Sequence, residues 1–200
     1  MQNALAKRWA HLDVTTRSHS DVVVFSQDSG PTSGHQVITI NGAHAEALVV
    51  GGVAYARADA AAVTSFLGFP ASQVQRLAGH WISLVSTDAG YQTVSQGVTL
   101  ASALGEETIA SPEKVGAPTV LYGAGAVPIS FTVAPTGGGP SGTGTLYIST
   151  GPATLPIELD VVGSDGSKTN ARFSAWGAVA PLTAPSGAIP AATVPVDASS

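Results

Sequence analysis

Histidine and carboxylate side chains are the residues of this chain that could bind a metal ion or move a proton. The five histidines stand at positions 11, 19, 35, 44 and 80, and no two of them are four residues apart. A metal-binding helix presents two histidines at that spacing, as in H-E-x-x-H. His11 with Asp13, and His19 with Asp21, instead share a face of predicted strands, where a solvated histidine beside a carboxylate is the commoner arrangement. We therefore expect no metal site.

Three short segments resemble catalytic or phosphate-binding motifs but lack their partners. Asp28-Ser29-Gly30 has neither the strand–Ser–helix setting of a G-x-S-x-G nucleophile nor an assignable histidine. The glycine-rich stretch from Gly137 to Gly144 is followed by neither Lys-Ser/Thr nor a predicted helix, which favours a hairpin loop over a phosphate site. Glu106-Glu107 lies at a predicted helix end, whereas glycosidase carboxylates come from different elements.

These observations predict a protein that is not an enzyme and that needs no cofactor. The absence of cysteine removes thiol nucleophiles, thiolate metal sites and disulfides. A hydrolase of an unrecognised type stays open as an alternative, because catalytic triads are recognised by geometry and not by sequence position. A screen with ester and glycoside substrates would detect it, and we expect that screen to be negative.

Charged residues are scarce and unevenly distributed. They make up 10% of the 200 residues, against roughly 25% in typical globular domains. No charged residue occurs between Val115 and Ile157, and no Lys or Arg between Ser18 and Ala56. Both blocks are rich in Thr, Ser, Val and Gly, which is typical of a sheet surface that hydroxyl groups keep wet. Eight basic against thirteen acidic residues argue against a nucleic-acid partner.

Alternating apolar and polar residues predict strands at both ends of the chain. The N-terminal part contains a short helix at 4–10 and then strands at 12–17, 21–26, 35–40, 45–50 and 53–57, with Asn41-Gly42 and Gly51-Gly52 as tight hairpin turns. From Pro118 onward the period of two returns, and it predicts strands at 119–122, 127–133, 144–150, 156–162 and 169–179.

The middle of the chain has a helical character. We expect helices at 58–67, 71–78 and 91–104, with an extended segment at 81–85 and a polar link over 106–117. Strands that cluster on either side of helices predict an α+β fold with an antiparallel sheet. We expect one domain over 1–180, made of strands 12–57, a helical insert 58–105 and strands 118–180. A Pro-rich tail over 181–200, extended or disordered, follows.

Four strings, in order, resemble actinobacterial cell-envelope lipoproteins of the broad LppX/LprG type, which are related in architecture to the LolA-like carriers. Leu77 to Ile82 resembles their LAGKWI segment, with His80 in place of the common Lys. The other three strings are Val49–Asp59, Gly144–Ser149 with Leu155–Ile157, and Phe173–Gly177 with Ala184-Pro185 and Ile189-Pro190. The resemblance covers roughly residues 35 to 190.

This resemblance implies a curled antiparallel sheet, a half-barrel, with the helical insert packed on its concave face and an apolar cavity between them. It also implies an extracytoplasmic protein of the cell envelope. Such proteins usually begin with a signal peptide and a lipidated Cys. This chain has neither, so either it was trimmed to its soluble domain or the protein is not anchored. We favour trimming, in which case membrane association would need the missing lipid anchor.

Two functions follow from the resemblance. The first is the binding or carriage of a lipid, an acyl chain or a lipid-linked molecule in the cavity, for which small residues such as Ala61, Ala62, Ala71, Ala78, Gly97 and Ala101 would leave room. The alternative is a structural or protein-interaction domain with a closed core, in which those residues simply let helices pack closely. For the first we predict a lining of Phe66, Leu67, Val94, Val98, Ile129, Phe131, Leu146, Ile148, Leu159 and Phe173.

Overall fold

Tight turns with left-handed residues connect the N-terminal strands into a meander. Asn41 and Gly42 have φ of 51° and 87°, and Gly51 and Gly52 have φ of 61° and 79°, as two-residue hairpins require. The computed structural model describes residues 4, 9–105, 109–133, 141–178 and 182–194. The strands of this meander are β1 (Ala10–Arg17), β2 (Val22–Ser29), β3 (Gly34–Ile40), β4 (Ala43–Val50) and β5 (Val53–Ala58).

A second meander is formed by the C-terminal half of the chain. Its strands are β8 (Thr119–Leu121), β9 (Ala124–Val133), β10 (Gly142–Ser149), β11 (Pro156–Gly163) and β12 (Lys168–Ser174). The predicted strand 169–179 ends at Ser174 because Ala175 adopts a left-handed φ of 47°. Four of these five strands, together with the first meander, belong to one path, and β8 pairs with β9 beside that path.

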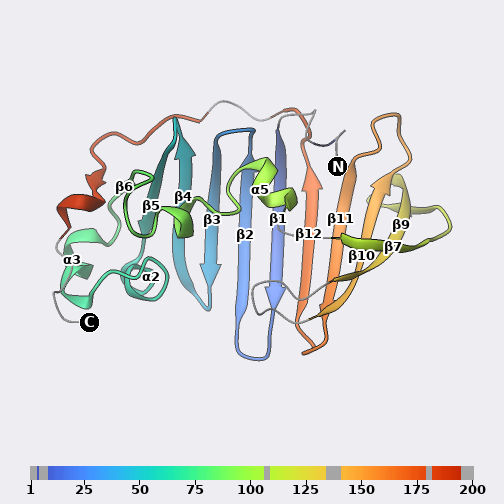
Figure 1. Cartoon of the computed structure of the whole chain (residues 1–200), viewed down its shortest axis with the longest axis horizontal. Helices are drawn as coiled ribbons and strands as arrows, with labels where there is room; N and C mark the ends of the chain where they lie inside the picture. Colours follow the sequence, from blue (N-terminus) through green and yellow to red (C-terminus); the bar gives the residue numbers. More distant parts are fainter. Residues whose placement is uncertain (1–3, 5–8, 106–108, 134–140, 179–181, 195–200) are drawn as a thin grey trace.

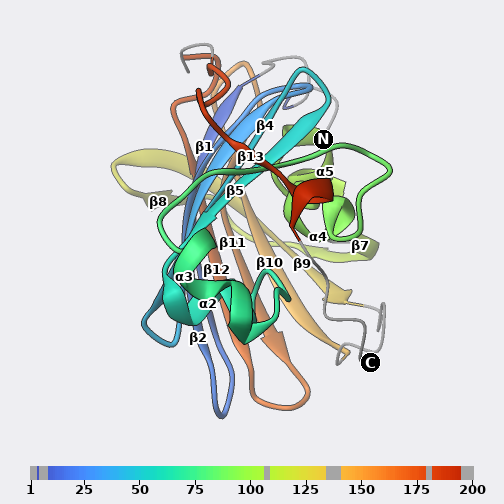
Figure 2. The same cartoon turned by 90° about the vertical axis from the view of Figure 1, so that its left-hand side faces the viewer.

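The two meanders join through β1 and β12, so that thirteen strands make a single open sheet (Figure 1). Leu12 lies opposite Phe173, and Val14 opposite Ala171. The order is β13-β6-β5-β4-β3-β2-β1-β12-β11-β10-β9-β7. All pairings are antiparallel except that of β13 with β6, and the sheet twists strongly from one end to the other (Figure 2). The chain is therefore α+β with a large, mostly antiparallel sheet.

Residues 60–105 form short helices that pack on one face of this sheet, which we call the inner face (Figure 2). Asp59 caps α2 by accepting a hydrogen bond from the backbone N–H of Ala62 at 2.8 Å. The elements are α2 (Ala60–Ser65), the 3₁₀ turn η1 (Ala71–Gln73), α3 (Val74–Leu77), strand β6 (Ile82–Leu84), α4 (Tyr91–Ser95) and α5 (Leu100–Gly105).

The helix predicted over 91–104 is broken. Gln96 is extended with ψ of 136°, and Gly97 has a left-handed φ of 74°, so α4 ends at Ser95 and α5 begins at Leu100. The glycine that weakens a continuous helix is thus the residue that turns the chain. We call residues 96–99 the α4–α5 connection.

Two other segments differ from the sequence-based expectation. Residues 109–115, predicted as part of a link, form strand β7 (Ile109–Val115), which pairs irregularly with β9. In the Pro-rich segment, β13 (Ile189–Pro190) pairs with β6, the 3₁₀ turn η2 (Ala191–Thr193) follows, and Val194 is buried. Residues 189–194 are therefore docked on the sheet and do not form a free tail.

The helix predicted at 4–10 lies mostly outside the described residues. Its last predicted residue, Ala10, is instead the first residue of β1.

Candidate functional site

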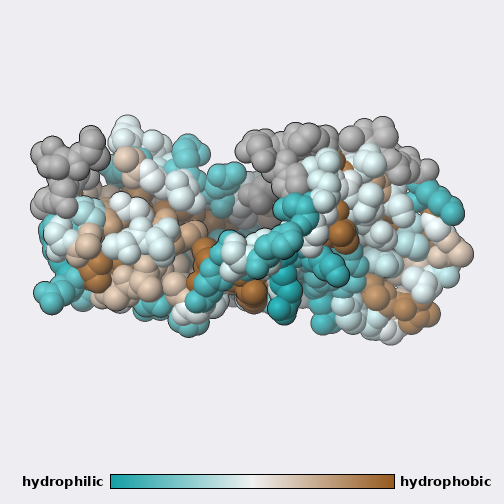
Figure 3. Space-filling model, turned by 90° about the horizontal axis from the view of Figure 1, so that it is seen from below, coloured by the Kyte–Doolittle hydropathy of each residue, from teal (hydrophilic) through white to brown (hydrophobic). Residues whose placement is uncertain are grey.

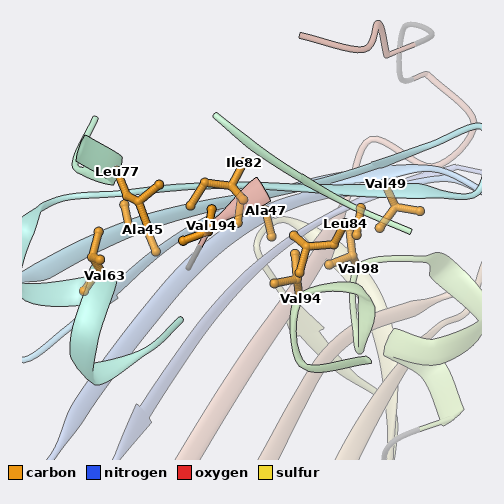
Figure 4. Close-up of a cluster of buried hydrophobic side chains, with 14 residues drawn as sticks. Ala45, Ala47, Val49, Val63, Leu77, Ile82, Leu84, Val94, Val98 and Val194 are labelled. Atoms are coloured by element: carbon orange, nitrogen blue, oxygen red, sulfur yellow. The ribbon is translucent and has the colours of Figure 1, made fainter. Parts of the chain in front are cut away.

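The inner face of the sheet carries two clusters of buried apolar side chains. Cluster 1 lies over β4, β5 and β6, where five sheet alanines face α2, α3 and α4 (Figure 4). Its buried members are Ala45, Ala47, Val49, Ala54, Ala56, Ala58, Ala62, Val63, Leu77, Ile82, Leu84, Val94, Val98 and Val194. Cluster 2 lies over β1, β12, β11 and β9, and its buried members are Ala4, Ala10, Leu12, Val14, Leu100, Leu104, Phe131, Leu159, Ala171 and Phe173.

A pocket of about 440 Å³ opens beside cluster 1, and we call it pocket 1. Its floor is Ala56 and Leu84 from the sheet, and its sides are residues 67–70, the start of α4, and η2 from the C-terminal segment. Asp88 is the one charged residue among those that line it. Pocket 1 is thus an apolar hollow that the docked segment 191–194 helps to close.

A second pocket of about 240 Å³, pocket 2, lies between the sheet and the α4–α5 connection on the side of cluster 2. Its apolar wall includes Leu12, Phe25 and Phe173, and glutamine and threonine side chains complete the lining. No charged residue borders it among the residues that the structure describes. Seen from below, the surface is hollowed between the two ends of the molecule, and apolar residues are visible in the hollow (Figure 3).

The predicted lining residues separate into these two regions. Leu67 and Val94 line pocket 1, while Leu159 and Phe173 line pocket 2. Val98 and Phe131 are fully buried within clusters 1 and 2, Phe66 packs against cluster 1, and Leu146 packs against cluster 2. Ile129 and Ile148 are half-buried and line neither pocket. The ten residues therefore do not surround one common cavity.

The small residues that make room are mostly in the sheet. Ala61, Ala71 and Ala101 on the helices are exposed, whereas Ala62 and Gly97 are buried. The positions that keep the helices close to the sheet are Ala45, Ala47, Ala54, Ala56 and Ala58, each at most 4% exposed. Their alternation along β4 and β5 was the available signal for an alanine-lined inner face.

A network of buried amides separates the two clusters. Gln27 on β2 donates from Nε2 to the carbonyl of Gly97 at 2.6 Å, and Ser29 donates to the carbonyl of Val98 at 3.1 Å. Gln36 on β3 donates from Nε2 to Oε1 of Gln27 at 2.8 Å. These bonds hold the α4–α5 connection on the sheet, because a break in a helix leaves carbonyl groups that need donors.

Close packing at Gly34 also allows the α4–α5 connection to lie against β3. A Cβ built at Gly34 would lie 2.0 Å from the carbonyl oxygen of Val98, so that only glycine allows the connection to come this near to β3. Strands β2 and β3, the α4–α5 connection and the buried amides thereby form one structural unit between the pockets.

The opposite, outer face of the sheet carries the polar and charged side chains. His11 bonds to Asp28 through Nδ1 at 2.7 Å and lies 3.3 Å from Asp13. Burial lowers the pKa of His11, but the hydrogen bond to Asp28 and the charges of Asp13 and Asp28 outweigh burial and raise the pKa above 6.5. Glu46 joins Arg57, at 2.5 Å, to His35, at 3.4 Å.

This polar face has no arrangement that could hold a metal ion among the described residues, where no three His, Asp or Glu side chains lie close enough together. A cation–π contact forms where Arg172 lies 4.0 Å above the ring of Tyr122, whose hydroxyl donates to Glu158. No described helix is long and apolar enough to cross a membrane.

Comparison with known proteins supplies the last observation. No protein-family model and no curated protein matches the sequence. Among solved structures, the crystal structure of the Mycobacterium tuberculosis lipoprotein LppX matches with a TM-score of 0.55 and 15% identity, over 91% of this chain and 95% of that chain. A DUF1329 family protein from Desulfovibrio piger matches with a TM-score of 0.30 and 9% identity, over 87% of this chain and 89% of that one. This chain therefore has the LppX/LprG-type fold.

Proposed function

We propose that this chain is a non-catalytic protein of the cell envelope that binds or carries a lipid or a lipid-linked molecule. The observation that carries the proposal is pocket 1, a hollow of about 440 Å³ with a mainly apolar lining. Ligand pockets typically measure about 300–1,000 Å³. The fold shared with a lipoprotein supports the same function. The twisted sheet acts in this proposal as a half-barrel whose concave side is the inner face.

The driving force for binding is the removal of acyl chains from water. Each methylene that enters the pocket contributes about 0.8 kcal/mol. Leu67, Leu84 and Val94 supply apolar contacts, and Ala56 leaves space that a larger side chain would fill. Leu67, Phe69 and Pro70 belong to the loop after α2, which together with η2 forms the rim.

Native mass spectrometry of the purified protein, followed by lipid extraction, tests the proposal. We expect an added mass that organic solvent removes. A protein that carries no lipid and takes up none from mixed vesicles would contradict it.

A pair of tryptophan variants tests the place of binding. Thr93 is exposed and lines pocket 1, so Thr93→Trp should obstruct the pocket with little effect on stability. Thr64 is also exposed on a helix but does not line the pocket, which makes Thr64→Trp the matched control. We expect lipid uptake to fall in the first variant only. Equal uptake in both variants would exclude pocket 1 as the binding site.

The alternative is a structural or protein-interaction domain with a closed core. It is favoured by the full burial of Val98 and Phe131, two predicted lining residues that instead lie within filled clusters. A pull-down in which binding of a partner protein is lost on substitution of exposed loop residues, but not of Thr93, would favour this second function.

A further inference from the structure

The buried amides beside pocket 2 have a fixed orientation. The carbonyls of Gly97 and Val98 can only accept hydrogen bonds, so Gln27 must direct Nε2 toward them at 2.6 and 3.2 Å. Its Oε1 then accepts from Nε2 of Gln36. The break between α4 and α5 thus determines which way both amides point.

Gln36 is the end of this chain of amides, and it has bonding capacity left. The residue as a whole is only 8% exposed, and the single hydrogen bond of its side chain uses one of the two N–H groups of Nε2. Within the described residues, Oε1 of Gln36 and the second N–H form no hydrogen bond with the protein. Because no buried polar side-chain atom there lacks a partner, Oε1 is open to solvent. Gln36 also lines pocket 2, so this unused donor and acceptor belong to the wall of a pocket.

The remaining lining defines the chemistry of a matching group. Leu12, Val14, Phe25, Leu159 and Phe173 are apolar, and Thr16, Thr169 and Gln96 are polar but uncharged. A charged headgroup would meet no counter-charge here and would lose its hydration. The volume of about 240 Å³ is smaller than that of a typical ligand pocket and suits one part of a larger molecule.

We propose, on the basis of the proposed function, that pocket 2 recognises a neutral hydroxyl group on the ligand's hydrocarbon chain through Gln36. A hydroxyl donates to Oε1 and accepts from the free N–H, so it satisfies both unused groups at once. The ligand class is then a neutral lipid with a hydroxylated chain, whose purely hydrocarbon part lies along the apolar wall.

Selectivity between matched probes tests this assignment. The probes are methyl stearate and a series of methyl hydroxystearates that differ only in the position of one hydroxyl, measured by displacement of a bound fluorescent fatty acid. At one or more positions we expect the hydroxylated ester to bind at least about five-fold more tightly, because one neutral hydrogen bond already gives about that factor and the hydroxyl forms two. Equal affinity for all probes would overturn the assignment.

Variants then locate the effect. Gln36→Met keeps the size of the side chain and removes its polar groups, so we expect the preference for the hydroxylated ester over methyl stearate to vanish. Thr39→Val on the same strand removes a hydrogen bond to His44 on the outer face and should leave the preference intact. A preference that persists in Gln36→Met would overturn the role of Gln36.

The two proposals fail in different ways. Binding of every probe without preference leaves lipid binding in place and overturns only the hydroxyl assignment. Binding of no probe at all overturns both. Because the selectivity of the wild-type protein needs no substitution, the inference stays testable even if Gln36→Met does not fold.

Discussion

Clusters 1 and 2 are built in opposite ways on the same face of one sheet. In cluster 1 strands β4 and β5 present mainly alanines, and most of the larger side chains come from the helices, the short strand β6 and the C-terminal segment. In cluster 2 the strands themselves carry the large side chains, among them Phe131 and Phe173. Ring stacking of Phe173 with Trp176 at 6.0 Å extends this aromatic packing past the end of β12.

The difference explains where open space remains. Alanines fill little of the space between the sheet and the helices, and the larger of the two pockets lies on this side. Around Phe131 the side chains of the strands fill the space on the inner face. Gly144 leaves room for the Phe131 ring, because a Cβ at Gly144 would lie 2.3 Å from Cζ of Phe131. We therefore expect cluster 2 to dominate stability and cluster 1 to dominate ligand uptake.

The largest expected effect is that of Phe131→Ala. Phe131 is 1% exposed, and its removal should lower the free energy of unfolding by about 3–5 kcal/mol because a cavity remains. Urea unfolding followed by tryptophan fluorescence measures this change. Leu77→Ala in cluster 1 is the matched comparison, since Leu77 is fully buried. A smaller loss for Phe131→Ala than for Leu77→Ala would contradict the assigned importance of cluster 2.

Overpacking of cluster 1 should have an intermediate effect. Ala56 is 1% exposed and lines pocket 1, so Ala56→Leu should cost about 1–3 kcal/mol and reduce lipid uptake. Thermal unfolding and lipid extraction measure the two quantities. Ala61→Leu adds the same atoms at an exposed position on α2 and should change neither. Unchanged uptake in Ala56→Leu would separate cluster 1 from ligand binding.

Loss of the Asp59 cap of α2, a helix that packs in cluster 1, should have a smaller effect on the free energy of unfolding. Asp59 accepts hydrogen bonds from the backbone N–H groups of Ala62 and His44, both at 2.8 Å, and these bonds lower its pKa below 3.8. Asp59→Ala should cost about 1 kcal/mol at neutral pH. Since the pKa is lowered, the contribution is complete above pH 3.8 and is lost as the pH falls through the folded-state value.

Chemical unfolding at pH 7 and at pH 3 measures this cap. The difference between wild type and Asp59→Ala should shrink at the lower pH. Asp59→Asn retains a capping oxygen and is the control. A pH-independent difference would show that the carboxylate charge does not contribute.

The smallest expected effect is the pH response of His11, on the outer face behind cluster 2. Because the pKa of His11 is raised, its stabilising contribution is complete below pH 6.5 and is lost as the pH rises through the folded-state pKa. The pair is partly exposed, so the change should stay below about 1 kcal/mol. Thermal unfolding between pH 5.5 and 8.5 should give a flatter profile for His11→Gln than for the wild type. Identical profiles would exclude this response.

Strand content was largely predictable because its signals are local. Asn41-Gly42 and Gly51-Gly52 mark hairpins through their own φ preferences, and the period of two in β9 to β12 identifies the buried face. The break at Gly97 was visible only as a weakness in the predicted helix. The docking of residues 189–194 had no local signal, because Pro190 and its neighbours are compatible with a free extended segment.

The lining of the candidate site was predictable only in part. Period-two patterning correctly identifies Leu159 and Phe173 as inner-face residues, but it does not say whether a buried side chain borders a pocket or fills a core, as Phe131 does. Gln27 and Gln36 carried no motif, since an amide in a strand becomes significant only when the carbonyls of Gly97 and Val98 lie beside it.

The sequence by itself determined the two meanders, their turns and the helical insert, because each depends on residues near one another in the chain. Tertiary structure decided that β1 pairs with β12 across more than 150 positions, that the α4–α5 connection rests on buried amides, and that the C-terminal segment closes pocket 1. These contacts depend on which surfaces meet after the sheet has twisted, and no local pattern encodes that meeting.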